Sequence, residues 1–143
     1  MYRNVLITEN QRCLQQILWR FNPSEEVKKY KLNTVTYGTA SAPYLATRCL
    51  VQLGQECTDT HIQETILHDF YVDDYISGHD SMQELIRICK GVTTQLQTGQ
   101  FNLRKWQSNS KLILDTIQQN NSTDELLTLN NDSCAKTLGL HLT

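Results

Sequence analysis

The feature that most constrains the fold is a pair of adjacent aspartates, Asp73 and Asp74, set between two short apolar runs. Residues 70–72 (Phe-Tyr-Val) are typical of a β-strand and lead into the pair. Residues 75–78 (Tyr-Ile-Ser-Gly) lead out of it and end in turn-forming residues. The pattern predicts a β-hairpin with the aspartates at or beside its turn. Because neighbours in a flat strand point to opposite faces, two cooperating carboxylates are better placed at such a turn.

The two carboxylates have two interpretations. Like charges this close repel each other unless a cation lies between them. Oxygen ligands of this kind suit Mg²⁺, and a pair of carboxylate-bound metal ions promotes in-line phosphoryl or nucleotidyl displacement. The alternative is that Asp73 and Asp74 are the polar residues of an ordinary hairpin turn. The dipeptide taken alone favours the ordinary turn, so the surrounding sequence has to decide.

Composition indicates one folded domain. A chain of 143 residues with 39% hydrophobic residues can bury one core but not two. The net charge of −2 argues against a free-standing nucleic-acid binder that relies on a basic patch.

The cysteines indicate a reducing compartment. They are odd in number, five, and lack CxxC spacing, which fits reduced cytosolic thiols. Cys57, His61 and Glu64 are spaced so that they could share one helix face, but without a fourth ligand nearby the sequence gives little support for a zinc site. A signal peptide and a membrane-spanning apolar run are both lacking, so we expect a cytoplasmic protein with no membrane partner.

Helical and strand patterns alternate around the aspartate hairpin. Strand-like residues occupy five further segments: 2–7, 11–21, 27–35, 101–106 and 136–143. Helical spacing occupies four segments: 41–53, 57–67, 81–98 and 108–117. The third of these helices has a capping box at Ser81–Glu84 and ends at Gly99. The order predicts an α+β fold in which an antiparallel sheet, including the hairpin, packs on helices.

Four segments resemble reverse transcriptases and follow in that family's order. Tyr71–Asp74 (YVDD) at a hairpin tip resembles the family's active-site motif. Residues 30–44 (YKLNTVTYGTASAPY) resemble the block that lies upstream of it, and residues 99–109 (GQFNLRKWQSN) resemble the lysine-bearing block downstream. Residues 136–140 (KTLGL) are similar to the strand that grips the primer. Each segment is weak alone, but four in order with sensible spacing are a strong signal.

Three shorter segments indicate which group of reverse transcriptases the chain resembles most. Residues 18–20 (Leu-Trp-Arg), 37–38 (Tyr-Gly) and 103–106 (Leu-Arg-Lys-Trp) are most similar to reverse transcriptases of the BEL/Pao group of LTR retrotransposons. The resemblance covers nearly the whole chain, residues 1–143, and implies a partial polymerase palm subdomain. It also implies that the family's first metal-binding aspartate lies just before Met1, so that the palm is truncated on its N-terminal side.

The resemblance implies roles for the residues around the metal ions. Asp73 corresponds to a direct ligand and Asp74 to its support, with two Mg²⁺ ions as cofactors and Mn²⁺ as a substitute. Lys105 corresponds to the residue that neutralises or protonates the leaving pyrophosphate, although the adjacent Arg104 could take that place. The alternative for the aspartates remains simple turn polarity.

Further residues would contact the substrates. Tyr2 corresponds to a steric gate against the ribose 2′-hydroxyl, with a core aromatic as the alternative. Tyr37 and Gly38 would line the nucleotide pocket, or would simply form a turn before the helix.

The primer and template would contact two other segments. Trp19 and Arg20 would touch the template, although a tryptophan in a strand is more often a core residue. Leu138 and Gly139 would belong to the primer grip. The tryptophan expected at the end of that block is replaced by His141 and Leu142.

The expected function is RNA-directed DNA polymerisation. A primer 3′-hydroxyl would attack a dNTP on an RNA or DNA template, and the isolated chain would be inactive without the upstream aspartate. The expected partners are the template with its primer, the dNTP and the rest of the retrotransposon polyprotein, in a cytoplasmic particle. The net charge fits this function if basic fingers and thumb regions lie outside the segment. The alternative is a non-enzymatic retroelement remnant or an interaction module.

Overall fold

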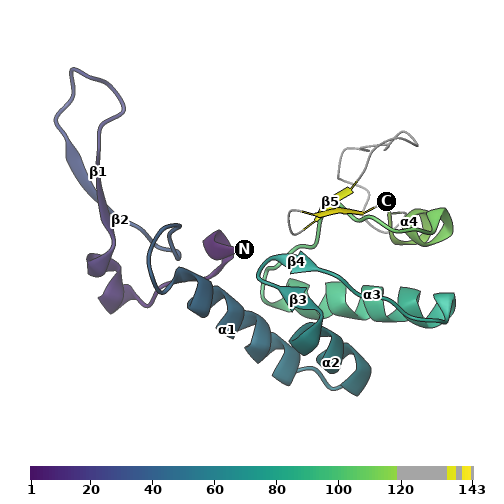
Figure 1. Cartoon of the computed structure of the whole chain (residues 1–143). Coiled ribbons are helices and arrows are strands. Elements are labelled where there is room, and N and C mark those ends of the chain that lie inside the picture. The colour runs from purple at the N-terminus through teal and green to yellow at the C-terminus, as the bar shows by residue number, and fades with distance from the viewer. Residues whose placement is uncertain (119–134, 138–139, 143) are drawn as a thin grey trace. The chain divides into compact units, whose positions relative to one another are not determined.

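Short strands and helices alternate along the chain (Figure 1). The structure, a computed structural model, describes residues 1–118, 135–137 and 140–142. The chain divides into two units, Met1–Leu50 and Val51–Thr143. The described elements are, in order, η1 (Tyr2–Asn4), η2 (Glu9–Leu14), β1 (Gln16–Trp19), β2 (Lys28–Lys31), α1 (Ala42–Gln55), α2 (Thr60–His68), β3 (Phe70–Tyr71), β4 (Asp74–Tyr75), α3 (Met82–Thr98), α4 (Lys111–Gln118), β5 (Ala135–Thr137) and β6 (Leu140–Leu142).

Helices and small antiparallel sheets together give an α+β fold, as the sequence predicts. The described strands pair as three separate two-stranded sheets, β1–β2, β3–β4 and β5–β6. The single larger sheet that we expected is therefore not formed by the strands that the structure describes. Each of these strands is short, at two to four residues. In each sheet the two strands are consecutive in the chain.

The first unit begins with 3₁₀ turns where the sequence predicts a strand. The prediction for residues 2–7 is wrong: residues 2–4 form η1, and Leu6 makes only an isolated bridge with Thr34. The Arg12 side chain donates a hydrogen bond to the Ile7 carbonyl at 2.9 Å. Residues 5–7 instead lie along residues 33–35, because the Ile7 amide donates to the Asn33 carbonyl and the Val35 amide donates to the Val5 carbonyl, both at 2.9 Å.

The strands predicted over residues 11–21 and 27–35 are present in a shortened form, as β1 and β2. β1 and β2 pair antiparallel with Gln16 opposite Lys31 and Trp19 opposite Lys28. The Gln15 side-chain amide extends this pairing, because it donates to the Leu32 carbonyl at 2.9 Å. The segments predicted over 11–21 and 27–35 therefore do meet, although only four residues of each are strand.

The helix α1 begins where Pro43 predicts it. Proline is tolerated in the first turn, where backbone N–H groups have no intrahelical partner. Ala42, Ala46 and Leu50 recur every four residues and are buried, so they form the inner face of the helix. Gly54 lies in the last turn of α1, so the helix extends two residues beyond the segment predicted over 41–53.

The second unit is built around α3. Its N-cap is Ser81, whose hydroxyl accepts a hydrogen bond from the Glu84 amide at 3.4 Å, and its C-cap is Gly99, as predicted. The core residues of α3 are spaced as one helical face: Ile88, Cys89, Val92 and Leu96. The helix α2 approaches α3 closely, because a Cβ built on Gly91 would lie 2.1 Å from the Ile62 side chain.

The segment after α3 is a loop and not the strand that we predicted over 101–106. Gln100 and Lys105 have φ angles of 63° and 57°. Residues in this left-handed region cannot continue an extended strand. Phe101 is nevertheless buried, and its amide donates to the Leu96 carbonyl at 3.0 Å, so the loop folds back on the end of α3. The helix expected after Ser108 is confirmed as α4.

A three-residue ion network joins the starts of α2 and α3. Arg87 lies 2.6 Å from the Asp59 carboxylate and 2.6 Å from the Glu84 carboxylate. Asp59 is also the N-cap of α2, where it accepts from the amides of His61 and Ile62. The hydrogen bonds from Arg87 hold the pKa values of both carboxyls below their usual range.

This network should make stability depend on pH in a defined direction. A carboxyl whose pKa is lower in the folded state stabilises the fold above its unfolded pKa, about 4 for Asp and Glu. That contribution is lost as the pH falls through the lower folded value. Arg87→Met should therefore lower the Tm at pH 7, and the Tm difference from the wild type should shrink below about pH 4.

The matched control is Lys90→Met, which removes a cation from the same helix without breaking an ion pair among the described residues. Circular dichroism melts at pH 7 and at low pH provide the measurement. A Tm difference for Arg87→Met that is the same at both pH values would contradict the assignment.

Candidate active site

The aspartate motif forms the β-hairpin that the sequence predicts. β3 and β4 pair antiparallel, with Phe70 opposite Tyr75 and Tyr71 opposite Asp74. Residues 72–73 are therefore the two residues of the turn, so Asp73 lies in the turn and Asp74 is the first residue of β4.

The turn is strained at the residue before Asp73. Val72 has a φ of 57°, and it is the only residue of the hairpin with a positive φ. Two-residue hairpin turns require a positive φ at the first turn position, where glycine is preferred. A β-branched residue there is unusual and costs of order 1–3 kcal/mol. Strained backbone of this kind concentrates at functional sites, which favours the functional interpretation of Asp73.

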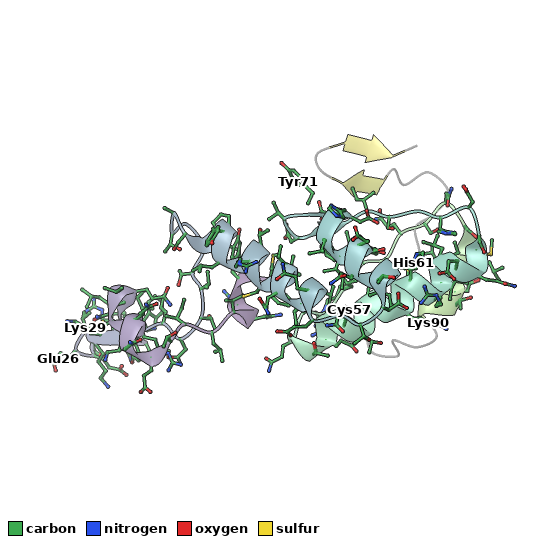
Figure 2. The ribbon with its side chains drawn as sticks, turned by 90° about the horizontal axis from the view of Figure 1, so that it is seen from below. Glu26, Lys29, Cys57, His61, Tyr71 and Lys90 are labelled. Carbon is green, nitrogen blue, oxygen red and sulfur yellow. The ribbon has the colours of Figure 1, made fainter. Side chains whose placement is uncertain are left out.

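The hairpin has one open face and one packed face. Side chains opposite each other lie on the same face, so Tyr71 and Asp74 share one face while Phe70 and Tyr75 share the other. Tyr71 is 67% exposed, and Figure 2 shows its side chain projecting outward from the hairpin. Asp74 is half-buried, and Asp73 is exposed in the turn. Both carboxylates are therefore accessible from the open side.

The packed face is held by three aromatic rings. The rings of Phe70 and Tyr75 stack with centroids 5.0 Å apart and an interplanar angle of 25°. Tyr75 also meets Trp106 edge to face at 5.9 Å and 85°. Burial raises the pKa of the Tyr75 hydroxyl far above its ordinary value, so this residue remains a neutral phenol. The contact of Trp106 with Tyr75 was not predicted from the sequence, although Trp106 lies in the lysine-bearing segment 99–109.

Lys105 lies in an exposed loop immediately before Trp106. Its φ of 57° makes it one of three non-glycine residues with a positive φ among those described. Within the described part of the chain, no ion pair joins Lys105 to Asp73 or Asp74. The structure thus places the lysine next to a residue that contacts the hairpin, without a direct contact to the carboxylates.

The structure brings together the two tyrosines assigned to the nucleotide pocket. The rings of Tyr2 and Tyr37 meet edge to face with centroids 4.7 Å apart. Tyr2 is half-buried and Tyr37 is 62% exposed, so one edge of the pair is open to solvent. Gly38 has a φ of 84°, and a Cβ there would meet no atom within 4 Å. Backbone conformation, and not crowding, is therefore the reason for glycine at this position.

The template residues lie on the exposed hairpin β1–β2 of the first unit. Trp19 is 52% exposed, so the alternative of a core tryptophan is wrong. The ring centroid of Phe21 lies 6.2 Å from that of Trp19 and 6.4 Å from that of Tyr30. Three aromatic side chains therefore lie together at this hairpin. Arg20 is exposed beside them.

The same hairpin carries several cations. Lys29 and Lys31 lie on the face opposite Tyr30, whereas Lys28 shares the face of Trp19. Figure 2 labels Glu26, which lies just before β2, and Lys29, which lies within β2. The hairpin therefore combines exposed rings with positive charge.

The primer-grip residues Leu138 and Gly139 lie outside the described residues. On either side of them, β5 and β6 pair antiparallel with Thr137 opposite Leu140. The single strand predicted over 136–143 is therefore wrong, since its described residues form two short strands.

The aspartate pair could supply part of the ligand shell of a Mg²⁺ ion. No group of three His, Cys, Asp or Glu side chains converges on a metal position among the described residues. Mg²⁺ is commonly held by one or two carboxylates, with water and substrate phosphates completing its shell. Asp73 and Asp74 supply such carboxylates on an accessible hairpin, so they fit a site that is completed by a bound triphosphate.

The possible zinc group suggested by spacing does not form. Cys57 precedes α2, whereas His61 and Glu64 lie within it, so the three do not share one helix face (Figure 2). Glu64 instead pairs with His68 at 3.1 Å.

Comparisons of the chain with protein-family models, with curated proteins and with solved structures each find no match. None of the helices that the structure describes is both long enough and apolar enough to cross a membrane.

The hairpin geometry predicts the effect of Asp73→Asn on folding. Asparagine keeps the size and hydrogen-bonding reach of aspartate and is well tolerated in turns. Without metal, the substitution removes repulsion between the adjacent carboxylates. The Tm of the variant in EDTA should therefore equal or exceed that of the wild type.

A marked loss of Tm for Asp73→Asn would indicate instead that the carboxylate shapes the turn. Asp80→Asn, an exposed aspartate a few residues further along the chain, is the control for a general effect of charge.

Proposed function

We propose that this chain is the palm part of a reverse transcriptase of the BEL/Pao type, an RNA-directed DNA polymerase. The observation that carries the proposal is the tight hairpin that presents Asp73 in a strained turn, with Asp74 beside it on an open face. The order of the surrounding segments supports the same family. Nucleotidyl transfer needs this arrangement, because carboxylates must reach metal ions while primer and triphosphate approach from solvent.

The hairpin supplies one half of a two-metal site. The metal ions would activate the primer hydroxyl and neutralise charge on the triphosphate. Asp73 would hold a metal ion directly and Asp74 would support it. A further carboxylate from another strand completes the site, since one hairpin cannot surround two ions. The primer 3′-oxygen attacks the α-phosphorus, the bond to the bridging oxygen breaks, and pyrophosphate leaves. Lys105 offers an ammonium to that leaving group.

Tyr2, Tyr37 and Gly38, all in the first unit, would contact the nucleotide. The edge-to-face contact holds Tyr2 in place, so that its ring excludes a 2′-hydroxyl by volume. Gly38 adopts a backbone conformation that other residues adopt with strain, which lets the chain turn close to a base pair.

The hairpin β1–β2 suits the template strand. Exposed rings can stack on bases of any sequence, and neighbouring cations can follow the phosphates. Trp19 and Arg20 combine both chemistries at one end of β1. Leu138 and Gly139 belong to the primer grip. The protein acts with the rest of its polyprotein in a cytoplasmic particle.

A second candidate function is an interaction module that has no catalytic activity. The same hairpin β1–β2 favours it, because Leu18, Trp19 and Phe21 are exposed and large apolar groups on a surface often mark a binding site for another protein. This candidate predicts no role for the aspartates.

Metal binding at the hairpin separates the two candidates. In an amide NMR spectrum, Mn²⁺ should broaden the signals of residues near the turn at about millimolar concentration, because the two carboxylates provide only part of a shell. Asp73→Asn should weaken this binding by at least about tenfold, the lower end of the loss seen when even an indirect metal partner is removed.

Asp80→Asn is the matched control and should leave the broadening unchanged. Broadening that is equal in Asp73→Asn and the wild type would place the ion elsewhere and contradict the polymerase assignment.

A further inference from the structure

The aspartate hairpin is too short to hold its own conformation. β3 and β4 contribute two residues each, and an isolated two-stranded hairpin is marginally stable even when longer. One more backbone hydrogen bond, from the Ile76 amide to the Asp69 carbonyl at 3.0 Å, closes its base. The strained φ of Val72 adds a cost at the other end. The direction of the carboxylates must therefore depend on what the packed face touches.

The packed face touches the core through Tyr75 and Trp106. Trp106 and Tyr75 both pack on a buried cluster made by α3 and α4, whose members are Cys89, Ile113 and Ile117. Its ring edge meets Tyr75, which stacks in turn on Phe70. The indole nitrogen of Trp106 is buried and has no hydrogen-bond partner among the described residues. Its contribution to the hairpin is therefore packing of the ring and not a polar contact.

Fixing Tyr75 also fixes the direction of Asp74. The two residues are neighbours in β4, so their side chains point to opposite faces. When Trp106 and the buried cluster keep Tyr75 on the packed face, Asp74 must lie on the open face beside Tyr71. The position of Asp73 in the turn is determined as well, because the register of the hairpin decides which two residues form the turn.

The same ring connects the hairpin to the basic loop. Trp106 directly follows Lys105, whose left-handed conformation turns the chain between an exposed lysine and a half-buried tryptophan. We propose that Trp106 is the positioning residue of the proposed catalytic site, which orients Asp73 and Asp74 through Tyr75 and anchors the loop that carries Lys105. This inference rests on the function proposed above, and it assigns Trp106 no contact with substrate.

The test compares two substitutions of Trp106 in the 143-residue chain. Trp106→Leu keeps an apolar side chain but removes the ring, whereas Trp106→Phe keeps a ring that can still meet Tyr75 edge to face. The hydrogen-exchange rate of the Ile76 amide reports how stably the hairpin is formed. The affinity for Mn²⁺, measured by titration, reports whether the two carboxylates are oriented for metal binding. Leu96→Ala, which truncates a fully buried α3 residue outside this cluster, is the control for general loss of stability.

Trp106→Leu should accelerate exchange at Ile76 more than at amides within α3, and weaken Mn²⁺ binding by about tenfold or more, as the loss of an indirect metal partner does. Trp106→Phe should restore both toward the wild type. Leu96→Ala should accelerate exchange across the second unit without singling out Ile76.

Two results would overturn the inference: equal effects of Trp106→Leu and Leu96→Ala on Ile76 relative to α3, or Mn²⁺ binding that Trp106→Leu leaves unchanged. If the wild type binds no Mn²⁺ while Trp106→Leu still loosens the hairpin selectively, the proposed function fails and the orienting effect of Trp106 on the hairpin stands.

Discussion

The contact between Tyr75 and Trp106 is the interaction on which the candidate site depends. Both rings pack on the core cluster of α3 and α4, and their centroids lie 5.9 Å apart, so the contact holds the short aspartate hairpin against that cluster. A hairpin with two residues in each strand cannot supply enough of its own stabilisation. Packing on one face therefore sets where the other face points. Because side chains alternate along β4, packing of Tyr75 on one face leaves Asp74 on the other.

Strain and packing have complementary effects in this hairpin. Val72 adopts a left-handed φ that a β-branched residue reaches only at a cost, which the surrounding structure has to offset. The rings of Phe70, Tyr75 and Trp106 provide that support from the packed face. The positive φ at Val72 belongs to the two-residue turn, and its unusual feature is the β-branched residue at that position.

Local signals in the sequence predicted the parts of the fold that depend on neighbouring residues. The capping box at Ser81 and the proline at the start of α1 gave correct helix ends, because capping is decided within one turn. The aspartate hairpin was also predicted, since its turn residues follow directly on a β-forming run. The strand over residues 101–106 was wrong, because left-handed residues are chosen by tertiary packing and have no apolar periodicity to reveal them. The link between Trp106 and Tyr75 was missed for the same reason.

The central claim is that Asp73 serves nucleotidyl transfer, and RNA-templated primer extension tests it most directly. The assay should use a polypeptide that joins this chain to an upstream strand bearing the further carboxylate, with Mg²⁺ and dNTPs. We predict template-dependent extension that Asp73→Asn reduces by roughly a thousandfold or more, because several kcal/mol of charge stabilisation are lost. Asp80→Asn should extend as the wild type does. Extension that survives Asp73→Asn unchanged would contradict the account.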